Sequence, residues 1–201
     1  GAEPAVTAAG LLGETLIGFA IGLGAAAVVG AAEVAGELMT TQVGLSGAAL
    51  LDPLSNQSVP VLGQLMQLFA VALLLAFDAH LAMIDAVAAS LRYIPVGSPV
   101  DFRGGMGAMV SLGSTLFSLG LRFAAPVLAA VLIANVALAV LSRVAPSLNV
   151  LSVAFPIQIG LGLFTLAAAL PLVAAWFTGW GAAYEGTLDH LLGALRGAGG
   201  R

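Results

Sequence analysis

The sequence VAPSLNVLSVAFPIQIGLGLFTLAAALPLVAAWFTGWGAAY at Val144–Tyr184 decides the fold class. These 41 residues contain no Asp, Glu, Lys or Arg, and one membrane-crossing helix needs only ~20 apolar residues. Three further uncharged stretches provide all or most of one span each, namely Thr15–Ala32, Pro53–Phe77 and Phe123–Ser142. Together they predict an all-α, polytopic membrane protein.

The composition excludes a water-soluble chain. Apolar residues of the AVILMFWYC set make up 60% of the sequence, the mean hydropathy is +1.09, and lysine is absent. Only 6 basic and 10 acidic residues occur among 201, which is too few to cover the surface of a soluble protein. The net charge of −4 and the lack of a basic patch exclude nucleic acid as a partner. The absence of cysteine excludes disulfides, thiolate metal sites and cysteine nucleophiles.

Turn-forming residues divide the chain into four long helical segments, predicted at residues 10–46, 60–94, 105–144 and 157–196. We expect one membrane domain made of two hairpins, 10–94 and 105–196. Each segment measures ~50–60 Å at 1.5 Å per residue, well over the ~30 Å thickness of the hydrocarbon core. Pro126 and Pro171 lie inside the third and fourth segments. Because proline removes a backbone donor, helix breaks are predicted there, giving long kinked hairpins.

The arginines predict the orientation. Arg92 and Arg103 flank the second connection, and Arg196 and Arg201 lie at the C-terminus, whereas Arg143 alone borders the third connection. Since positive charge favours the cytoplasmic side, we expect a cytoplasmic C-terminus.

The first residue is Gly1, and no basic region precedes the first apolar stretch. This start fits neither a signal peptide nor a normal translation start. We therefore expect that elements preceding residue 1 are missing from the sequence.

Small residues recur every four positions in the first segment, at Gly18, Gly22, Ala26 and Gly30. Such a face lets helix backbones approach closely inside a membrane. We predict that Gly18, Gly22 and Gly30 serve helix packing.

Two sets of polar residues interrupt the apolar helices. Glu33 and Glu37 repel each other at a spacing of four residues, so they face water, find partners or share a proton. A hydrated surface and the lining of a central conduit are the two interpretations. Gln42 follows them in the same segment. A second set falls within ~40° on one helix face if the second segment is continuous. Its members are Gln67, Asp78, Asp85 and Arg92. Both polar contacts between helices and a proton or substrate path remain open interpretations.

Nothing in the sequence predicts an enzyme. His80 and His190 are the only histidines, which argues against a zinc site, and no GxSxG, HExxH or phosphate-binding motif occurs. We therefore predict no catalytic residue, no metal and no cofactor.

The order of several short motifs resembles the FliR family of flagellar biosynthesis proteins, which belong to the type III secretion export apparatus. The resembling residues are Ala35-Gly36-Glu37, Gln42, Gly44-Leu45-Ser46, Asp52-Pro53, Pro60, His80-Leu81, Ser90, Pro95, Gly97, Arg143, Ala145-Pro146, Leu148-Asn149, Phe155-Pro156 and Pro171. They stay collinear over most of the chain. The family also has further N-terminal spans that this sequence lacks.

The resemblance implies a non-enzymatic core subunit of the export gate in the bacterial inner membrane, at the flagellar basal body. Such a subunit assembles with FliP-type and FliQ-type subunits into a helical, closed pore, which FlhB-type and FlhA-type subunits complete. Exported flagellar proteins would be its substrates, and membrane lipid a further contact. The resemblance also implies that the connection Gly47–Val59 forms a plug that closes the pore. The plug residues would be Ala48, Ala49, Leu50, Leu51, Asp52 and Pro53, because clustered apolar side chains close a constriction by dewetting.

Two alternatives stay open. The homologous SctT family of the virulence injectisome shares fold and role, although the residues from Asn149 to Phe155-Pro156 favour the flagellar branch. A small-solute transporter with a midplane site near Pro126 and Pro171 is the alternative from a different class. Transporters of that class commonly contain internal repeats, and none is evident here.

Overall fold

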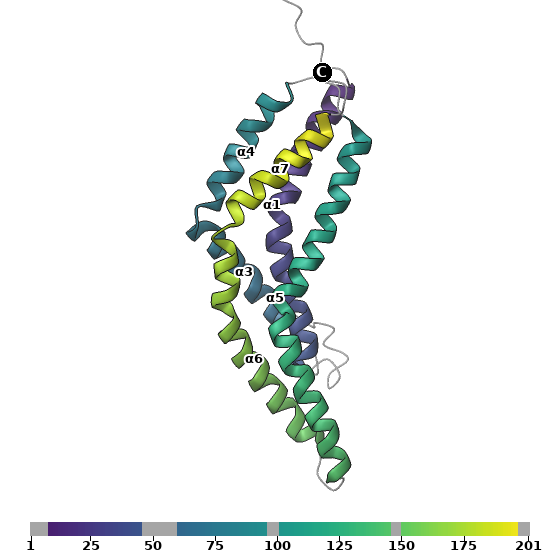
Figure 1. Cartoon of the computed structure of the whole chain (residues 1–201), viewed down its shortest axis with the longest axis vertical. Helices are drawn as coiled ribbons and strands as arrows, with labels where there is room; N and C mark the ends of the chain where they lie inside the picture. The colour runs from purple at the N-terminus through teal and green to yellow at the C-terminus, as the bar shows by residue number, and fades with distance from the viewer. Residues whose placement is uncertain (1–7, 46–59, 96–100, 146–149, 197–201) are drawn as a thin grey trace, which may run out of the picture. The chain divides into compact units, whose positions relative to one another are not determined.

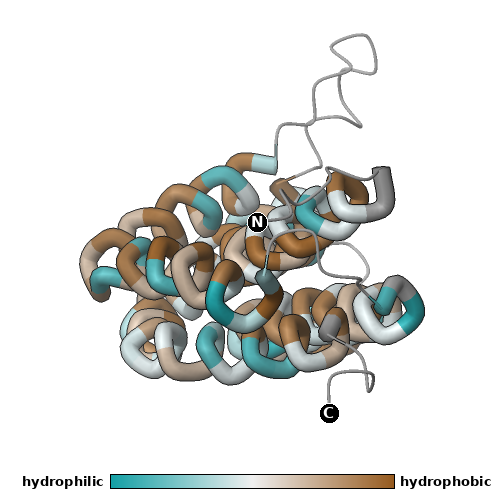
Figure 2. Tube along the Cα trace, turned by 90° about the horizontal axis from the view of Figure 1, so that it is seen from above, coloured by the Kyte–Doolittle hydropathy of each residue, from teal (hydrophilic) through white to brown (hydrophobic). Residues whose placement is uncertain are grey.

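The structure is a computed structural model that describes residues 8–45, 60–95, 101–145 and 150–196 (Figure 1). Within these ranges the chain forms α-helices and no strand, so the predicted all-α class is confirmed. The helices are α1 (Ala8–Gln42), α3 (Val61–Ala76), α4 (Ala79–Tyr93), α5 (Phe102–Val144), α6 (Val150–Phe177) and α7 (Trp180–Arg196). Hydrophobic residues predominate along most of these helices (Figure 2).

The four predicted helical segments are present, but two of them are broken. The second segment consists of α3 and α4, which are separated at Phe77–Asp78 and bent by 72°. The fourth consists of α6 and α7, which are separated at Thr178–Gly179. The fourth segment also begins earlier than predicted, since α6 starts at Val150 and contains Pro156.

The break at Asp78 has a backbone cause. Asp78 adopts φ 54° and ψ 21°, and among the described residues it is the only non-glycine residue with positive φ. Aspartate tolerates this left-handed region better than most residues. Its N–H donates to the Leu75 carbonyl at 3.3 Å, a tighter turn than the α-helix makes. The chain leaves α3 there and starts α4 in a new direction.

The helices are not interrupted at Pro126 and Pro171, so the predicted breaks are wrong, whereas kinks at these positions stay a prediction. α5 runs through Pro126, and α6 runs through both Pro156 and Pro171. A proline removes one backbone donor, but helices in membrane proteins tolerate it because local adjustment and neighbouring groups satisfy the freed carbonyl. The loss of one backbone hydrogen bond at a proline does not end a long apolar helix here. The left-handed backbone conformation of Asp78 does end α3.

Three helices are long and apolar enough to cross a membrane: Gly10–Gln42, Arg103–Val144 and Ser152–Phe177. The bent pair α3 and α4 makes a fourth span if both parts are counted as one. The polytopic membrane class is therefore confirmed.

The chain divides into two compact units. Unit 1 comprises Gly1–Val29, Val71–Leu116 and Trp176–Arg201, and unit 2 comprises Gly30–Ala70 and Phe117–Ala175. Each unit takes residues from both predicted hairpins. α1, α3, α5 and α6 each contribute residues to both units.

In unit 1, α4 packs against α7, and the two helices lie side by side (Figure 1). The rings of Trp180 and Tyr184 on α7 stack with centroids 4.7 Å apart. Asp101 caps the start of α5, since its Oδ1 accepts hydrogen bonds from the N–H groups of Arg103 at 3.0 Å and Gly104 at 3.2 Å. The N–H of Asp101 also donates to the Leu195 carbonyl at 2.8 Å, which joins the start of α5 to the end of α7.

In unit 2, α1 and α3 approach to backbone contact. A Cβ atom added at Gly36 would lie 2.6 Å from the Cα atom of Gly63 and would also meet the Leu62 carbonyl. One added at Gly120 on α5 would lie 3.1 Å from the Ala31 carbonyl oxygen of α1. The core beside these contacts includes the fully buried side chains of Met39, Met66, Val127 and Val131. Small residues thus bring three helices of unit 2 close together.

Candidate functional site

Glu33 forms a polar contact between two helices of unit 2. Its Oε2 accepts a hydrogen bond of 3.2 Å from Nε2 of Gln67 on α3, and Glu33 is half-buried. Glu37 is exposed, although its stem passes close to Gly63. The two glutamates therefore differ. Glu33 helps to hold α1 against α3, whereas Glu37 lies on the surface of unit 2.

A second polar contact joins α5 and α6, where Gln158 Nε2 donates to Asn135 Oδ1. This pair was not predicted from the sequence. Isolated amide residues in long apolar helices are a usable signal, because a buried amide without a partner is costly. Thr40 is also buried in unit 2, and its hydroxyl donates to the Gly36 carbonyl at 2.7 Å.

The predicted polar face of residues 60–94 does not form, because the helix is not continuous. Gln67 precedes the break and contacts Glu33 in unit 2, whereas Asp78, Asp85 and Arg92 belong to unit 1. The last three side chains are exposed, as is Gln42 at the end of α1. A polar path along one straight helix is therefore excluded.

The predicted packing glycines of α1 are open within this chain. Apart from the adjacent residues and backbone of α1 itself, no atom of the described residues lies within 4 Å of a Cβ added at Gly18 or at Gly22. Gly30 is half-exposed. Their packing against another protein stays a prediction. The glycines that do make close contacts are others, including Gly36, and Gly104, where a Cβ would lie 2.5 Å from the Ala194 carbonyl oxygen.

Gly18 and Gly22 line a groove of about 430 Å³ between α1 and α4 in unit 1. Glu14 and Ser90 contribute polar atoms, and Ile21, Met83 and Val87 contribute apolar surface. Tyr184 of α7 completes the lining. The groove is mostly apolar and shallow enough to expose both glycines.

Tyr184 joins α7 to α1 beside this groove. Its side chain is only 3% exposed, and its hydroxyl donates to the Ile21 carbonyl at 3.1 Å. Burial disfavours the charged tyrosinate and raises the pKa of Tyr184 to about 12. The hydroxyl therefore stays a neutral donor at physiological pH, so the contact is structural.

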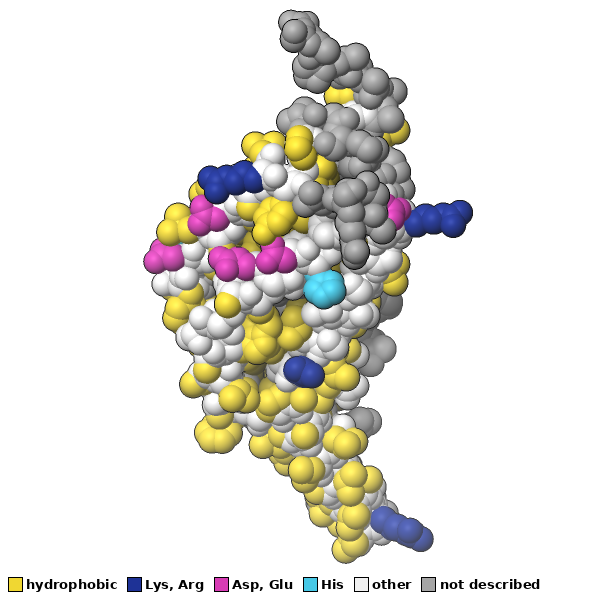
Figure 3. Space-filling view, turned by 45° about the horizontal axis from the view of Figure 1, so that its top comes forward, with side chains coloured by type: hydrophobic (Ala, Val, Ile, Leu, Met, Phe, Trp, Pro, Cys, Tyr) yellow, Lys and Arg dark blue, Asp and Glu magenta, His cyan; other side chains and the backbone are white. Residues whose placement is uncertain are grey.

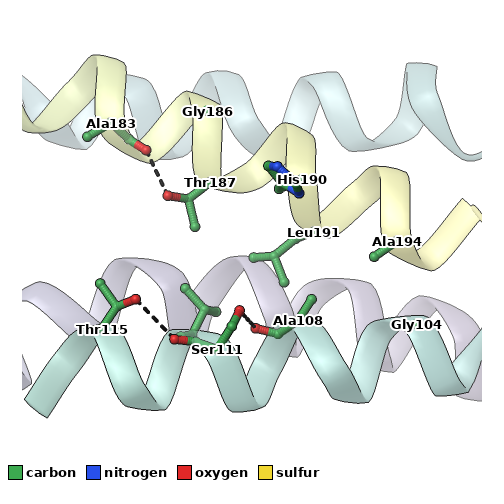
Figure 4. Close-up of a pocket in the computed structure, with 11 residues that line it drawn as sticks. Gly104, Ala108, Ser111, Thr115, Ala183, Gly186, Thr187, His190, Leu191 and Ala194 are labelled. Carbon is green, nitrogen blue, oxygen red and sulfur yellow. Dashed lines mark hydrogen bonds between the residues drawn. The ribbon is translucent and has the colours of Figure 1, made fainter.

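A second groove of unit 1, about 620 Å³, runs between the start of α5 and α7 (Figure 4). Most of its lining residues are small, and Ser111, Thr115, Thr187 and His190 bring polar atoms into it. The hydroxyls of Ser111 and Thr187 donate to the carbonyls of Ala108 and Ala183, at 2.6 Å and 2.8 Å. Since those protons are used within the helices, the groove has the character of a helix-packing surface rather than of a reactive site.

The predicted plug residues Ala48–Leu51, Asp52 and Pro53 lie outside the described residues, so the plug stays a prediction. Within the described part of the chain, no three His, Asp or Glu side chains come close enough to hold a metal ion. Nδ1 of His80 is buried without a hydrogen-bond partner among the described residues. The arrangement joins helices and offers open grooves.

The fold and these contacts define a class: an all-α membrane protein of long helices, joined by small-residue and amide contacts. The family described as bacterial export proteins, family 1, matches residues 2–181. The chain belongs to this family, and the predicted resemblance is confirmed.

Curated relatives extend this result. The chain is 34% identical over 161 residues to the flagellar biosynthetic protein FliR of Escherichia coli (strain K12), covering 80% of this chain and 62% of the relative. It is 35% identical over 163 residues to the FliR of Pectobacterium carotovorum subsp. carotovorum, covering 81% and 62%. It is 27% identical over 163 residues to the FliR of Bacillus subtilis (strain 168), covering 80% and 63%. The chain thus spans about three-fifths of the length of the relatives that it matches.

Proposed function

We propose that this chain is a non-enzymatic core subunit of the flagellar type III protein export gate. The observation that carries the proposal is the match to the bacterial export family over residues 2–181, together with relatives named FliR along about 80% of the chain. The helical fold supports it, because the chain has helices long and apolar enough to cross a membrane. Grooves lined by small residues stay open between some of these helices, and they suit packing against other subunits.

The proposed partners are FliP-type and FliQ-type subunits in the pore, and FlhB-type and FlhA-type subunits beside it. Exported flagellar proteins are the proposed substrates. The exposed surface supports such partners, since large apolar side chains cover much of the face seen in Figure 3. Apolar surface of this extent needs lipid or other subunits. We place the assembly in the inner membrane at the basal body, with a cytoplasmic C-terminus.

The assembly is tested by co-purification. The full chain, tagged and produced with FliP-type and FliQ-type subunits of one flagellar system, is extracted from membranes with a mild detergent. We expect a stoichiometric complex that survives gel filtration. A chain that elutes alone from membranes containing all three proteins contradicts the gate assignment and favours the transporter alternative. Association with virulence-type partners in place of flagellar ones favours the injectisome.

We also propose that the connection Gly47–Val59 plugs the pore. Small and apolar side chains at Ala48–Leu51 suit closure by dewetting, and Asp52-Pro53 suits a turn. Deleting Ala48–Leu51 should raise ion leakage across the membrane through an assembled gate. The control is the same gate without the deletion, at equal abundance. Unchanged conductance in an assembled gate that carries the deletion contradicts the plug.

A further inference from the structure

The helix α4 of unit 1 has small residues on its inner side and large ones on its outer side. It packs against α7, and its buried residues are Ala79, Ala86 and Ser90 (Figure 1). The apolar side chains of Leu81 and Leu91 are instead 51% and 55% exposed. Because large apolar side chains are normally the buried ones, this reversal indicates that the outer side of α4 packs against something else.

The outer side carries a regular stripe of four exposed apolar residues, spaced by three, four and three positions. Its members are Leu81, Ile84, Ala88 and Leu91, which we call the outer stripe of α4. At 100° per residue, the outer stripe lies about 160° around the helix from the buried residues. Spacings that alternate between three and four are those at which the side chains of one helix fit between those of another. The pattern therefore suits contact with a helix.

One edge of the outer stripe carries two opposite charges. Asp85 and Arg92 are both exposed, and they lie within about 20° of each other on the helix surface. They are seven positions apart, or about 10 Å along the axis, which is too far for the pairing that occurs at three or four positions. Charges beside an apolar stripe select the partner of a helix and its direction. The partner that fits has a cation opposite Asp85 and an anion opposite Arg92.

Lipid tails fit this side of α4 less well than a helix does. α4 contains 15 residues, whereas a helix that crosses the hydrocarbon core needs about 20. A carboxylate and a guanidinium are costly against hydrocarbon unless they find partners. A helix of complementary charge satisfies both groups, and lipid tails satisfy neither.

A second copy of this chain also fits less well. The outer stripe is symmetric about position 86, since positions 81 and 91 lie five residues to either side of it, and 84 and 88 two residues. An antiparallel copy that covers the whole stripe therefore brings the two Asp85 carboxylates together, and like charges that face each other are unfavourable. A parallel copy places Val87 against Arg92, because the two edges of the stripe then face each other. Neither direction pairs both charges.

We propose that the outer stripe of α4 binds a helix of another protein, which places a cation opposite Asp85 and an anion opposite Arg92. That helix carries apolar side chains at the same spacings, because these fill the gaps between Leu81, Ile84 and Leu91. The inference rests on the proposed function for the assembly in which the partner is found. It adds the surface that binds the partner and the chemistry of the partner helix.

Photo-crosslinking identifies what covers the outer stripe. The full chain, with p-benzoylphenylalanine in place of Ile84, is produced in membranes together with FliP-type and FliQ-type subunits of one flagellar system and is irradiated. We expect an adduct with one of these subunits. An adduct with lipid alone, or with a second copy of the chain, overturns the proposal. Leu91, replaced in the same way, is the second site if the first variant does not fold, and an assembled complex without an adduct at either site also overturns it.

The charges are tested by reversal. Asp85→Arg and Arg92→Asp should each reduce the amount of co-purified partner subunit several-fold, whereas Asp85→Glu should leave it unchanged. Asp189→Arg makes the same change of charge at an exposed position of α7 and is the matched control, which should assemble normally. Circular dichroism verifies that each variant folds. Normal assembly of both reversed variants overturns the pairing of charges across the stripe.

The failure of this inference can be told apart from the failure of the proposed function. If the wild-type chain elutes alone from membranes that contain all three proteins, the export-gate assignment fails and the docking surface fails with it. If the wild-type chain assembles, but no adduct forms at the outer stripe and both reversed variants assemble normally, only the docking surface is contradicted.

Discussion

The two parts of α1 are held by different kinds of contact. In unit 2, the part from Gly30 onward reaches backbone contact with α3 at Gly36, and Glu33 adds a hydrogen bond to Gln67. In unit 1, the part up to Val29 leaves Gly18 and Gly22 open and is joined to α7 through the Tyr184 hydroxyl. Glycines on one helix therefore differ in their roles, although the sequence presents them as similar.

This difference shows what a glycine contributes. At Gly36 the missing side chain is required, because the nearest atoms belong to another backbone and have no room to move. At Gly22 the missing side chain leaves a groove that nothing within the described chain fills. A closed contact should respond to substitution in the stability of the isolated chain. An open one should respond only when another molecule is present.

The largest expected effect comes from Gly36→Ala. The added methyl would meet the Leu62 carbonyl and the Cα atom of Gly63, so α1 and α3 would have to separate. We expect a loss of about 3 kcal/mol in the free energy of unfolding, in the upper range for overpacking. Reversible unfolding of the full chain in detergent measures it. Gly22→Ala on the same helix is the control, and equal effects of the two substitutions would remove the distinction between the two parts of α1.

The sequence could have indicated Gly36. Small residues at Ala32, Gly36 and Thr40 repeat every four positions, as they do from Gly18 to Gly30. Such a repeat predicts a close approach, but it does not say whether the neighbour belongs to the same chain. That information depends on how distant segments meet, which a local pattern does not contain.

The second prediction concerns the link in unit 1. Tyr184→Phe removes the hydrogen bond to the Ile21 carbonyl and should cost about 1 kcal/mol in the free energy of unfolding. The wild-type link should also weaken at alkaline pH. The pKa of Tyr184 is raised from 10.0 to about 12 in the fold, so the folded state holds this proton longer than the unfolded state does. The contribution of the Tyr184 hydroxyl to the free energy of unfolding is complete below pH 10 and declines as the pH rises through about 12.

Tyrosinate absorbance provides the measurement. Tyr93 and Tyr184 are the only tyrosines, so the difference between wild type and Tyr184→Phe isolates the titration of Tyr184. A midpoint near 10 in the folded chain would contradict the buried link. A loss of stability above pH 10 that is as large in the variant as in the wild type would assign that loss to other groups.

A third, smaller effect is expected at the polar contact of unit 2. The double-mutant cycle of Glu33→Ala and Gln67→Ala should give a coupling of about 0.6 kcal/mol, the magnitude typical of hydrogen bonds between membrane helices. Glu37→Ala combined with Gln67→Ala is the matched cycle and should give none, because Glu37 is exposed. Equal coupling energies in the two cycles would show that the coupling comes from negative charge on α1 rather than from the hydrogen bond between Glu33 and Gln67.

Much of the fold could be predicted from the sequence, whereas the site could be predicted only in part. Long uncharged stretches indicate the helical class because an α-helix of about 20 apolar residues crosses the hydrocarbon core and satisfies its backbone hydrogen bonds within one segment. The breaks were misplaced because proline is a strong signal in water and a weak one in a packed membrane helix, whereas Asp78 carries little local signal. The missed break at Asp78 also made the predicted polar face wrong. That face was obtained by adding 100° per residue along one helix, and this rule does not apply across a break. The predicted plug at Ala48–Leu51 rests on the resemblance and stays a prediction.

The smallest effect on the isolated chain is expected at the open groove. Gly22→Leu adds a side chain where no described atom lies within 4 Å of the Cβ position, and leucine favours a helix over glycine by about 0.8 kcal/mol. The free energy of unfolding of the isolated variant should therefore equal that of the wild type or be slightly higher. If the groove holds a partner helix, the leucine fills that space, and co-purification with FliP-type and FliQ-type subunits should fall while membrane insertion is unchanged.

Gly181→Leu on α7 is the matched control, since its Cβ position is also open and it lines neither groove. Normal assembly of the Gly22→Leu variant would show that this face contacts lipid or water. Reduced assembly of both variants would point to a general effect of added bulk.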